Sequence, residues 1–140
     1  MTEPAALETL FLDTAGLLAV AHQDELHHLR AAEYLRTCRN AVTHNYVLAE
    51  FLALAFVRGL PRRAALEFVD ALSNSPDIHI TWINEKLHMQ AMALLRARLD
   101  KGYTLCDAVS FTLMRNIGVQ AALTTDKHFV QEGFVRLLDR

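Results

Sequence analysis

Residues 104–129, TLCDAVSFTLMRNIGVQAALTTDKHF, contain the pattern that decides the fold. An apolar helix is expected to begin near Asp107, which follows Thr104 at the spacing of a helix cap and a first-turn acid. Gly118 interrupts the helical pattern, and the apolar run after it closes with Asp126, where a buried strand would give way to a loop. Open α/β sheets bind ligands at that edge. The stretch therefore predicts two carboxylates at one rim, one from a helix start and one from a strand end.

The length and composition favour one folded domain over residues 1–140. A chain of 140 residues buries roughly 68–70% of its unfolded surface on folding. Its hydrophobic content is 52% and its charged content 21%, with only 5 Gly and 3 Pro, which argues against a disordered chain. The formal net charge of -2 excludes a strongly basic protein. A nucleic acid would therefore have to bind through a local basic patch or through a metal ion.

The same sequence favours a reducing, aqueous compartment. Cys38 and Cys106 have no CxxC spacing, so we expect two reduced thiols. The N-terminus lacks the order of a signal peptide, and the longest apolar run, residues 51–57, is too short to span a bilayer. We therefore expect a soluble cytoplasmic protein with no membrane partner.

Short apolar runs alternate with helical patterns along the chain, after an expected loose start at residues 1–8. The expected strands are 10–12, 41–43, 78–82, 121–123 and 135–138, and residues 78–82 alternate as an edge strand does. The other expected helices are 14–21, 24–38, 45–58, 62–72 and 84–100, with an apolar stripe through Leu26, Leu29, Ala32 and Leu35 in the second. This alternation predicts an α/β fold with helices on both faces of a parallel sheet.

Two more acids complete a candidate site. Asp13 closes the first expected strand, and Glu50 lies in a helix that is apolar nearly all round, where an unpaired carboxylate would be costly. Each acid also has a structural explanation of its own. Asp13 suits a helix cap, Glu50 a solvent-facing stripe, and the two acids of the opening stretch a first turn and a loop turn. Together, however, three acids at element ends and a fourth on a neighbouring helix favour a shared site.

Such a cluster requires a counter-charge. Two carboxylates about 5 Å apart at an effective dielectric constant near 20 repel by roughly 3 kcal/mol. Mg²⁺ or Mn²⁺ relieves that repulsion, because both ions prefer oxygen ligands. A bound ion also activates water and neutralises charge on a phosphodiester. The acids therefore favour metal-assisted phosphodiester hydrolysis, whereas no nucleophile elbow and no Gly-rich phosphate loop is present.

Polar neighbours of the acids are candidate supporting groups: Thr14, Asn45, Thr124, Thr125 and Lys127. The threonine hydroxyls can hydrogen-bond a metal water or a carboxylate, although local turn bonding explains them equally well. Asn45 is expected to cap the helix that carries Glu50. Lys127 follows Asp126, where a phosphate would arrive.

The seven histidines do not form a recognisable zinc motif. His22, His27 and His28 lack the HExxH spacing of a zinc site. The remaining ones are expected at the surface or behind the acids: His44, His79, His88 and His128.

With the four acids in order, the chain resembles PIN-domain nucleases, and within them the VapC-like toxins of bacterial toxin–antitoxin pairs. The matching segments are FLDTAGLLAV at 11–20, THNYVLAEFLAL at 43–54, YTLCDAVSFTLM at 103–114 and LTTDKHFVQEGF at 123–134. The resemblance spans essentially the whole chain. It implies a three-layer α/β/α sandwich around a parallel sheet of about five strands.

The resemblance also implies a Mg²⁺- or Mn²⁺-dependent endoribonuclease, the toxin of a type II toxin–antitoxin pair. Asp13, Glu50 and Asp107 match the family's three core metal-binding and catalytic acids, and Asp126 matches a fourth whose direct metal contact stays open. Expected partners are RNA, a small antitoxin that inserts a segment across the active site, and a second copy of the chain. The alternatives are a catalytically silent RNA- or protein-binding module, a stand-alone nuclease, and a nuclease that also cleaves DNA.

Overall fold

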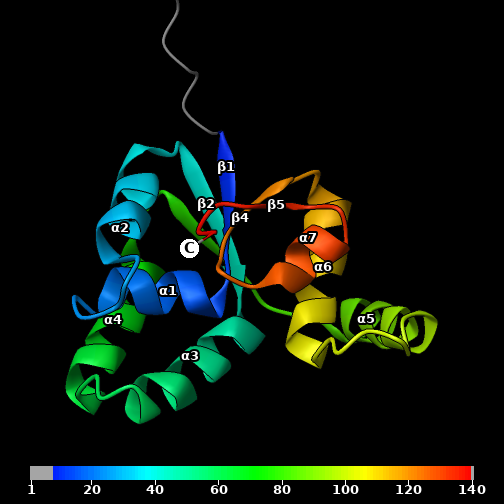
Figure 1. Ribbon diagram of the computed structural model, residues 1–140, viewed down its shortest axis with the longest axis horizontal. Helices are drawn as coiled ribbons and strands as arrows, with labels where there is room; N and C mark the ends of the chain where they lie inside the picture. The colour runs from blue at the N-terminus through cyan, green and yellow to red at the C-terminus, as the bar shows by residue number, and fades with distance from the viewer. Residues whose placement is uncertain (1–7, 140) are drawn as a thin grey trace, which may run out of the picture.

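Figure 1 shows the computed structural model, which describes residues 8–139. Five parallel strands form one sheet in the order β3-β2-β1-β4-β5. Their bounds are Thr9–Leu12 (β1), Asn40–His44 (β2), Ile78–Thr81 (β3), Ala121–Leu123 (β4) and Val135–Arg136 (β5). The predicted parallel sheet is confirmed, and so is the edge position of β3. Of the expected loose start at residues 1–8, residues 1–7 lie outside the described residues.

Within residues 8–139, seven helices connect these strands. Their bounds are Thr14–Ala21 (α1), His28–Thr37 (α2), Asn45–Val57 (α3), Arg62–Asn74 (α4), Glu85–Ala97 (α5), Leu105–Ile117 (α6) and Lys127–Gln131 (α7). Helices α1 to α4 lie on one side of the strands and α5 to α7 on the other (Figure 1). This arrangement confirms the α/β/α sandwich. No helix in the described part of the chain is long and apolar enough to cross a membrane.

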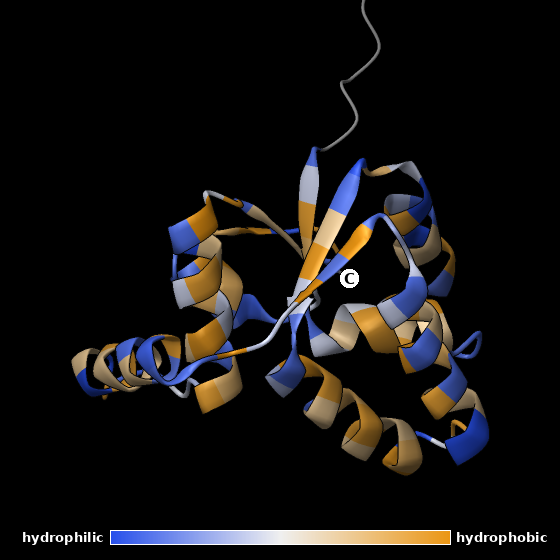
Figure 2. Ribbon diagram, turned by 180° about the vertical axis from the view of Figure 1, so that it is seen from behind, coloured by the Kyte–Doolittle hydropathy of each residue, from blue (hydrophilic) through white to orange (hydrophobic). Residues whose placement is uncertain are grey.

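The core lies along the central strands, where Figure 2 shows apolar residues on β1 and β2 and on the helix faces beside them. Phe11 on β1 is fully buried, as the continuous apolar run predicts. On the α6 side, the Phe111 ring packs edge-on against Phe129 of α7, with 4.9 Å between centroids, and stacks on Phe134 at 5.6 Å. These aromatic contacts fix α7 beside α6.

Two glycines set the positions of the helices that flank the central strands. At Gly16, a Cβ atom would lie 2.0 Å from the backbone oxygen of Leu123, so α1 approaches β4 more closely than any side chain allows. Gly118 ends α6 in the left-handed conformation, with φ of 75°, as its place in the sequence predicts.

The prediction for the second helix is wrong at its N-terminal end. Helix α2 begins at His28 rather than at residue 24, and Leu26 and Leu29 are 90% and 82% exposed. Residues 23–27 form turns and a bend instead, with hydrogen bonds from Glu25 N to His22 O and from His28 N to Glu25 O. The buried face of α2 therefore centres on Ala31, and the predicted stripe through the two leucines does not exist.

Other differences concern element ends. Helix α5 ends at Ala97 rather than at residue 100, and β5 covers only two of the four expected residues. Helix α7 has no counterpart among the predicted elements. It is five residues long, too short to show a helical period in the sequence.

Candidate metal centre

The carboxyl ends of β1 and β4 meet at the middle of the sheet and bring Asp13 next to Thr124. The Thr124 hydroxyl donates a hydrogen bond of 2.7 Å to Asp13 Oδ2. Asp13 occupies the N-cap position of α1, but its side chain makes no capping hydrogen bond. The carboxylate is 6% exposed and faces the neighbouring strand end instead. Helix capping therefore does not explain why an acid stands here.

Asp107 lies in the first turn of α6, where a capping box forms as the Thr104 spacing predicts. Thr104 Oγ1 accepts from Asp107 N, and Asp107 Oδ2 accepts from Thr104 N, both at 3.0 Å. The second carboxylate oxygen, Oδ1, has no hydrogen-bond partner among residues 8–139. One oxygen of this buried acid thus holds the helix start, and the other is free for a ligand.

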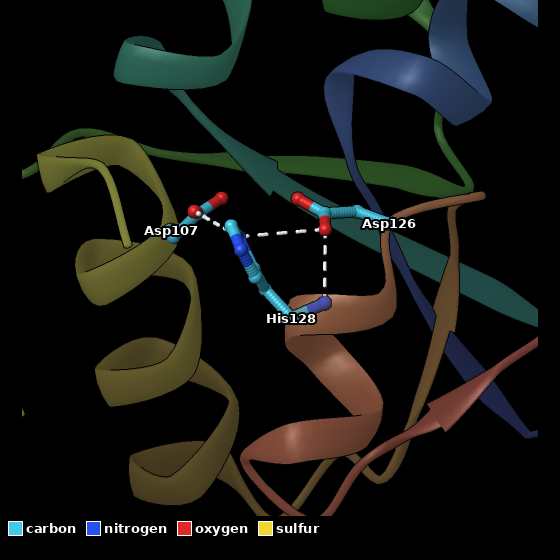
Figure 3. A group of neighbouring side chains, drawn as sticks. All are labelled: Asp107, Asp126 and His128. Atoms are coloured by element: carbon cyan, nitrogen blue, oxygen red, sulfur yellow. Dashed lines mark hydrogen bonds and ion pairs between the residues drawn. The ribbon is translucent and has the colours of Figure 1, made fainter. Parts of the chain in front are cut away.

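Asp126 and His128 complete a group with Asp107, drawn in Figure 3. Asp126 Oδ1 caps α7 by accepting from His128 N at 2.9 Å. The His128 Nδ1 atom lies 3.1 Å from Asp107 Oδ2 and 3.4 Å from Asp126 Oδ1. One ligand atom from each of the three residues lies within 4.8 Å of the others. The structure therefore brings two of the four predicted acids within reach of a single ion.

His128 is the main residue that the sequence argument underrated. An ionised carboxylate only accepts hydrogen bonds, so a ring nitrogen between two of them carries the proton and donates. His128 thus holds Asp107 and Asp126 together. The signal in the sequence is weak, since it consists of a histidine two residues after an Asp at an unrecognised helix start.

Thr124 connects Asp13 to this group. Its hydroxyl donates to Asp13 and accepts from Asp126 N at 3.0 Å, and the residue is completely buried. At the residue after Asp13, the buried Thr14 hydroxyl has no hydrogen-bond partner within the described residues. A polar atom in that state normally binds water or an ion.

Glu50 stands apart from the tight group of Asp107, Asp126 and His128. It is half-buried on the second turn of α3, so neither the fully buried nor the solvent-facing alternative describes it. Burial raises the pKa of the Cys106 thiol, and the charges of Glu50, Asp13 and Asp107 add to that increase. The Cys106 thiol is close enough to Glu50, Asp13 and Asp107 for all three charges to affect its pKa. Glu50 therefore lies at the same edge of the sheet as Asp13 and Asp107.

The remaining supporting candidates play different parts. The cap of α3 is His44, whereas Asn45 Oδ1 accepts from Ile83 N at 2.7 Å, so the predicted capping by Asn45 is wrong. Thr125 and Lys127 are both exposed beside Asp126. Their side chains make no hydrogen bond within residues 8–139.

An ion-pair cluster behind the site anchors α7. The Glu132 carboxylate, with 3% of its side chain exposed, accepts from Arg98 Nε at 2.6 Å, from Arg115 Nη2, and from the Tyr103 hydroxyl at 3.2 Å. Arg98 follows the last residue of α5, and Tyr103 lies just before the start of α6. The cluster therefore joins these two helices to Glu132 at the end of α7. This connection fixes Asp126 relative to Asp107.

The electrostatics of the acids favour a cation. Burial raises the pKa of Asp13 to about 7, with the charges of Asp107 and Asp126 adding to it and the Thr124 hydrogen bond opposing it. Burial also raises the pKa of Asp107, and the charge of Asp126 contributes. A divalent ion would stabilise the charged forms. Hard oxygen donors with raised pKa values and the unpaired Thr14 hydroxyl together fit Mg²⁺ or Mn²⁺.

The raised pKa of Asp13 predicts a pH-dependent stability. This carboxyl ionises near 3.8 in the unfolded chain but near 7 in the folded protein, so the free energy of unfolding falls as the pH rises between these values. We expect Asp13→Asn, which keeps the Thr124 hydrogen bond without the charge, to stabilise the metal-free protein at pH 8 by on the order of 2–4 kcal/mol. Urea unfolding in EDTA at pH 5 and pH 8 measures the gain. The exposed Asp100→Asn is the control, and equal gains at both pH values would contradict the assignment.

The sequence and the fold were compared with those of known proteins. The PIN domain pattern matches residues 10–134. The 23S rRNA-specific endonuclease VapC20 of Mycobacterium tuberculosis, from strains CDC 1551 / Oshkosh and H37Rv, is 30% identical over 129 residues, which is 91% of this chain and 97% of that protein.

A solved structure agrees with these matches. The crystal structure of M. tuberculosis VapC20, described as a Sarcin-Ricin loop cleaving toxin, superposes with a TM-score of 0.82 at 28% identity. The superposition covers 90% of this chain and 96% of that one. Sequence and fold agree over nearly the whole length, and the chain belongs to the PIN domain family.

Proposed function

We propose that this protein is a Mg²⁺- or Mn²⁺-dependent endoribonuclease. The observation that carries the proposal is the meeting of Asp13, Asp107 and Asp126 at one sheet edge, where the first two have raised pKa values and the last two lie within reach of one ion. Membership of the PIN family and the similarity to an rRNA endonuclease support RNA as the substrate.

In this proposal the four predicted acids, Asp13, Glu50, Asp107 and Asp126, hold the metal. When bound, the ion supplies positive charge that lowers the pKa of a water molecule and stabilises charge on the phosphodiester. Thr124 orients Asp13 by hydrogen bonding, and His128 keeps Asp107 and Asp126 together.

Lys127 and the hydroxyls beside the acids complete the proposed site. Lys127 is exposed next to Asp126, on the side from which a phosphate approaches, and there it contacts the RNA backbone. Thr14 supplies its unpaired hydroxyl to a metal-bound water, and Thr125 presents an exposed hydroxyl at the rim.

We further propose a small antitoxin protein and a second copy of the chain as partners. The described toxin relative supports the first, because a cell that produces a ribonuclease toxin requires an inhibitor of it. Exposed apolar side chains support a protein partner in general. Leu26, Leu29, Phe56 and Val57, between 69% and 90% exposed, lie around α2 and the end of α3.

Cleavage of a labelled RNA tests the proposed activity. We expect the purified protein to cut RNA in Mn²⁺ or Mg²⁺ and to stop in EDTA, and Mn²⁺ at 100 times its dissociation constant to stabilise the fold by about 2.7 kcal/mol. A DNA strand of the same sequence is the matched substrate, and its cleavage would extend the activity to DNA. RNA binding without cleavage in any divalent metal would instead support the silent binding module and contradict the proposal.

A further inference from the structure

Three consecutive residues at the start of α3 reach across the structure to the elements on the other side of the sheet. His44 hydrogen-bonds Ser110 on α6, Asn45 accepts from the backbone of Ile83 before α5, and the Tyr46 hydroxyl lies 2.6 Å from His88 Nδ1 on α5. Helices α3 and α6 belong to opposite helical layers in Figure 1. The three contacts therefore connect the two layers at the edge that carries the acids.

His44 is the most constrained of the three. It is completely buried, and its Nδ1 accepts from Val47 N at 3.3 Å, which requires that nitrogen to be unprotonated. The proton then lies on Nε2, which donates to Ser110 Oγ at 2.8 Å. The Ser110 hydroxyl in turn donates to Cys106 O at 2.9 Å. Every polar atom of the His44 and Ser110 side chains thus makes a hydrogen bond. This is possible only in the His44 tautomer that carries its proton on Nε2.

The charge state agrees with this assignment. Burial lowers the pKa of His44 to about 3, so the ring is neutral at physiological pH. A neutral ring has one donor and one acceptor, as these two hydrogen bonds require. A serine at position 44 would cap α3 as well, but its side chain is too short to reach Ser110.

The contacts of residues 44–46 lie where they can affect the position of Glu50 in the proposed metal site. His44 begins the helix that carries Glu50, and Ser110 lies one turn after Asp107 on α6. Asp13 and Glu50 are the two predicted acids outside the tight group. Thr124 connects Asp13 to that group by hydrogen bonds, whereas the distance of Glu50 from the other acids depends on where α3 begins. We infer that His44, Asn45 and Tyr46 form an interlayer clamp that positions Glu50 relative to Asp107, with the His44–Ser110 hydrogen bond at its centre.

This inference rests on the proposed metal-dependent activity, and calorimetry of Mn²⁺ binding tests it. His44→Asn retains a cap for α3 but is too short for Ser110, and Ser110→Ala removes the same bond from the other side. We expect each variant to bind Mn²⁺ roughly tenfold more weakly, as loss of a group that orients metal ligands typically does. We expect the double variant to be no weaker than either single variant, because all three lack the same bond.

A control variant and RNA cleavage kinetics distinguish a role in positioning Glu50 from a general effect on protein stability. Thr112→Ala is the control, because Thr112 Oγ1 donates to Ala108 O within α6 as Ser110 Oγ does to Cys106 O, but this hydrogen bond does not reach the other helical layer. This variant should leave Mn²⁺ affinity unchanged. With RNA, the clamp variants should lower kcat at saturating substrate and leave KM unchanged, because the clamp residues do not touch the substrate. All measurements are made well below the melting temperature of each variant.

The outcomes distinguish the two proposals. A wild-type protein that neither binds Mn²⁺ nor cleaves RNA would overturn the proposed function and this inference with it. Normal wild-type behaviour with unchanged Mn²⁺ affinity in Ser110→Ala would overturn the clamp alone, as would equal losses in Ser110→Ala and Thr112→Ala. If His44→Asn does not fold, Ser110→Ala decides the result.

Discussion

Asp107→Asn is expected to abolish metal-dependent RNA cleavage and to leave the fold intact. Asn can accept the hydrogen bond from Thr104 N that starts α6, so the capping box survives in part. The negative charge disappears, however, from a buried acid whose Oδ1 has no hydrogen-bond partner among residues 8–139. Loss of groups behind a metal ligand already costs about 10–100-fold, so loss of the ligand's charge should cost more than about 100-fold in kcat/KM.

The comparison variants make this result interpretable. Asp70→Asn, on the exposed part of α4, changes the net charge equally and should cleave RNA as the wild type does. Asp107→Ala removes charge and cap together and should unfold at a lower temperature than Asp107→Asn. Circular dichroism confirms the fold of each variant. Wild-type cleavage by Asp107→Asn would contradict the metal site as a whole.

Gly16→Ala is expected to be the most destabilising single-methyl change in the chain. The new Cβ would lie 2.0 Å from Leu123 O and 2.8 Å from Leu123 C, and both are backbone atoms that cannot rotate away. Helix α1 would have to move off β4, at a cost of about 3 kcal/mol or more. The same movement would separate Asp13 from Thr124, so Mn²⁺ affinity should fall with stability.

Thermal unfolding with and without Mn²⁺ measures both effects. Gly102→Ala is the matched control, since its Cβ would meet the His128 ring at ordinary contact distances, 3.8 Å from Nε2 and 4.0 Å from Cε1. A loss of about 3 kcal/mol corresponds to a fall in Tm of roughly 10 °C for a domain of this size. A Gly16→Ala protein as stable as Gly102→Ala would show that the close approach of α1 to β4 is wrong.

Much of the fold could be predicted because local signals and the global arrangement agree. The continuous apolar runs at β1 and β4 require burial on both faces, which only a parallel sheet with two helical layers provides. The Thr104 and Asp107 spacing predicted the capping box that starts α6, although the helix begins at Leu105, two residues before Asp107. Gly118 located its end for an equally physical reason, since it has the positive φ that the cap requires.

The errors arise where tertiary contacts override a local pattern. Leu26 and Leu29 have helical spacing, yet Leu26 lies in the turn before α2 and Leu29 lies on the exposed face of the first turn of α2. His44 caps α3 in place of Asn45, because burial against α6 gives the histidine ring a partner that the sequence cannot show. Chain order revealed which acids share an edge, but not that Glu50 stands apart from the tight group.

The sheet also separates the site from the opposite edge of the molecule. All four acids follow or flank the carboxyl ends of the strands, whereas the turns after α2, α4 and α6 lie at the amino ends. A strand of four residues places roughly 13 Å between the two edges. Dyes, affinity tags or surface tethers attached at residues 38–39, 75–77 or 118–120 would therefore leave the acidic edge open for single-molecule or immobilised assays.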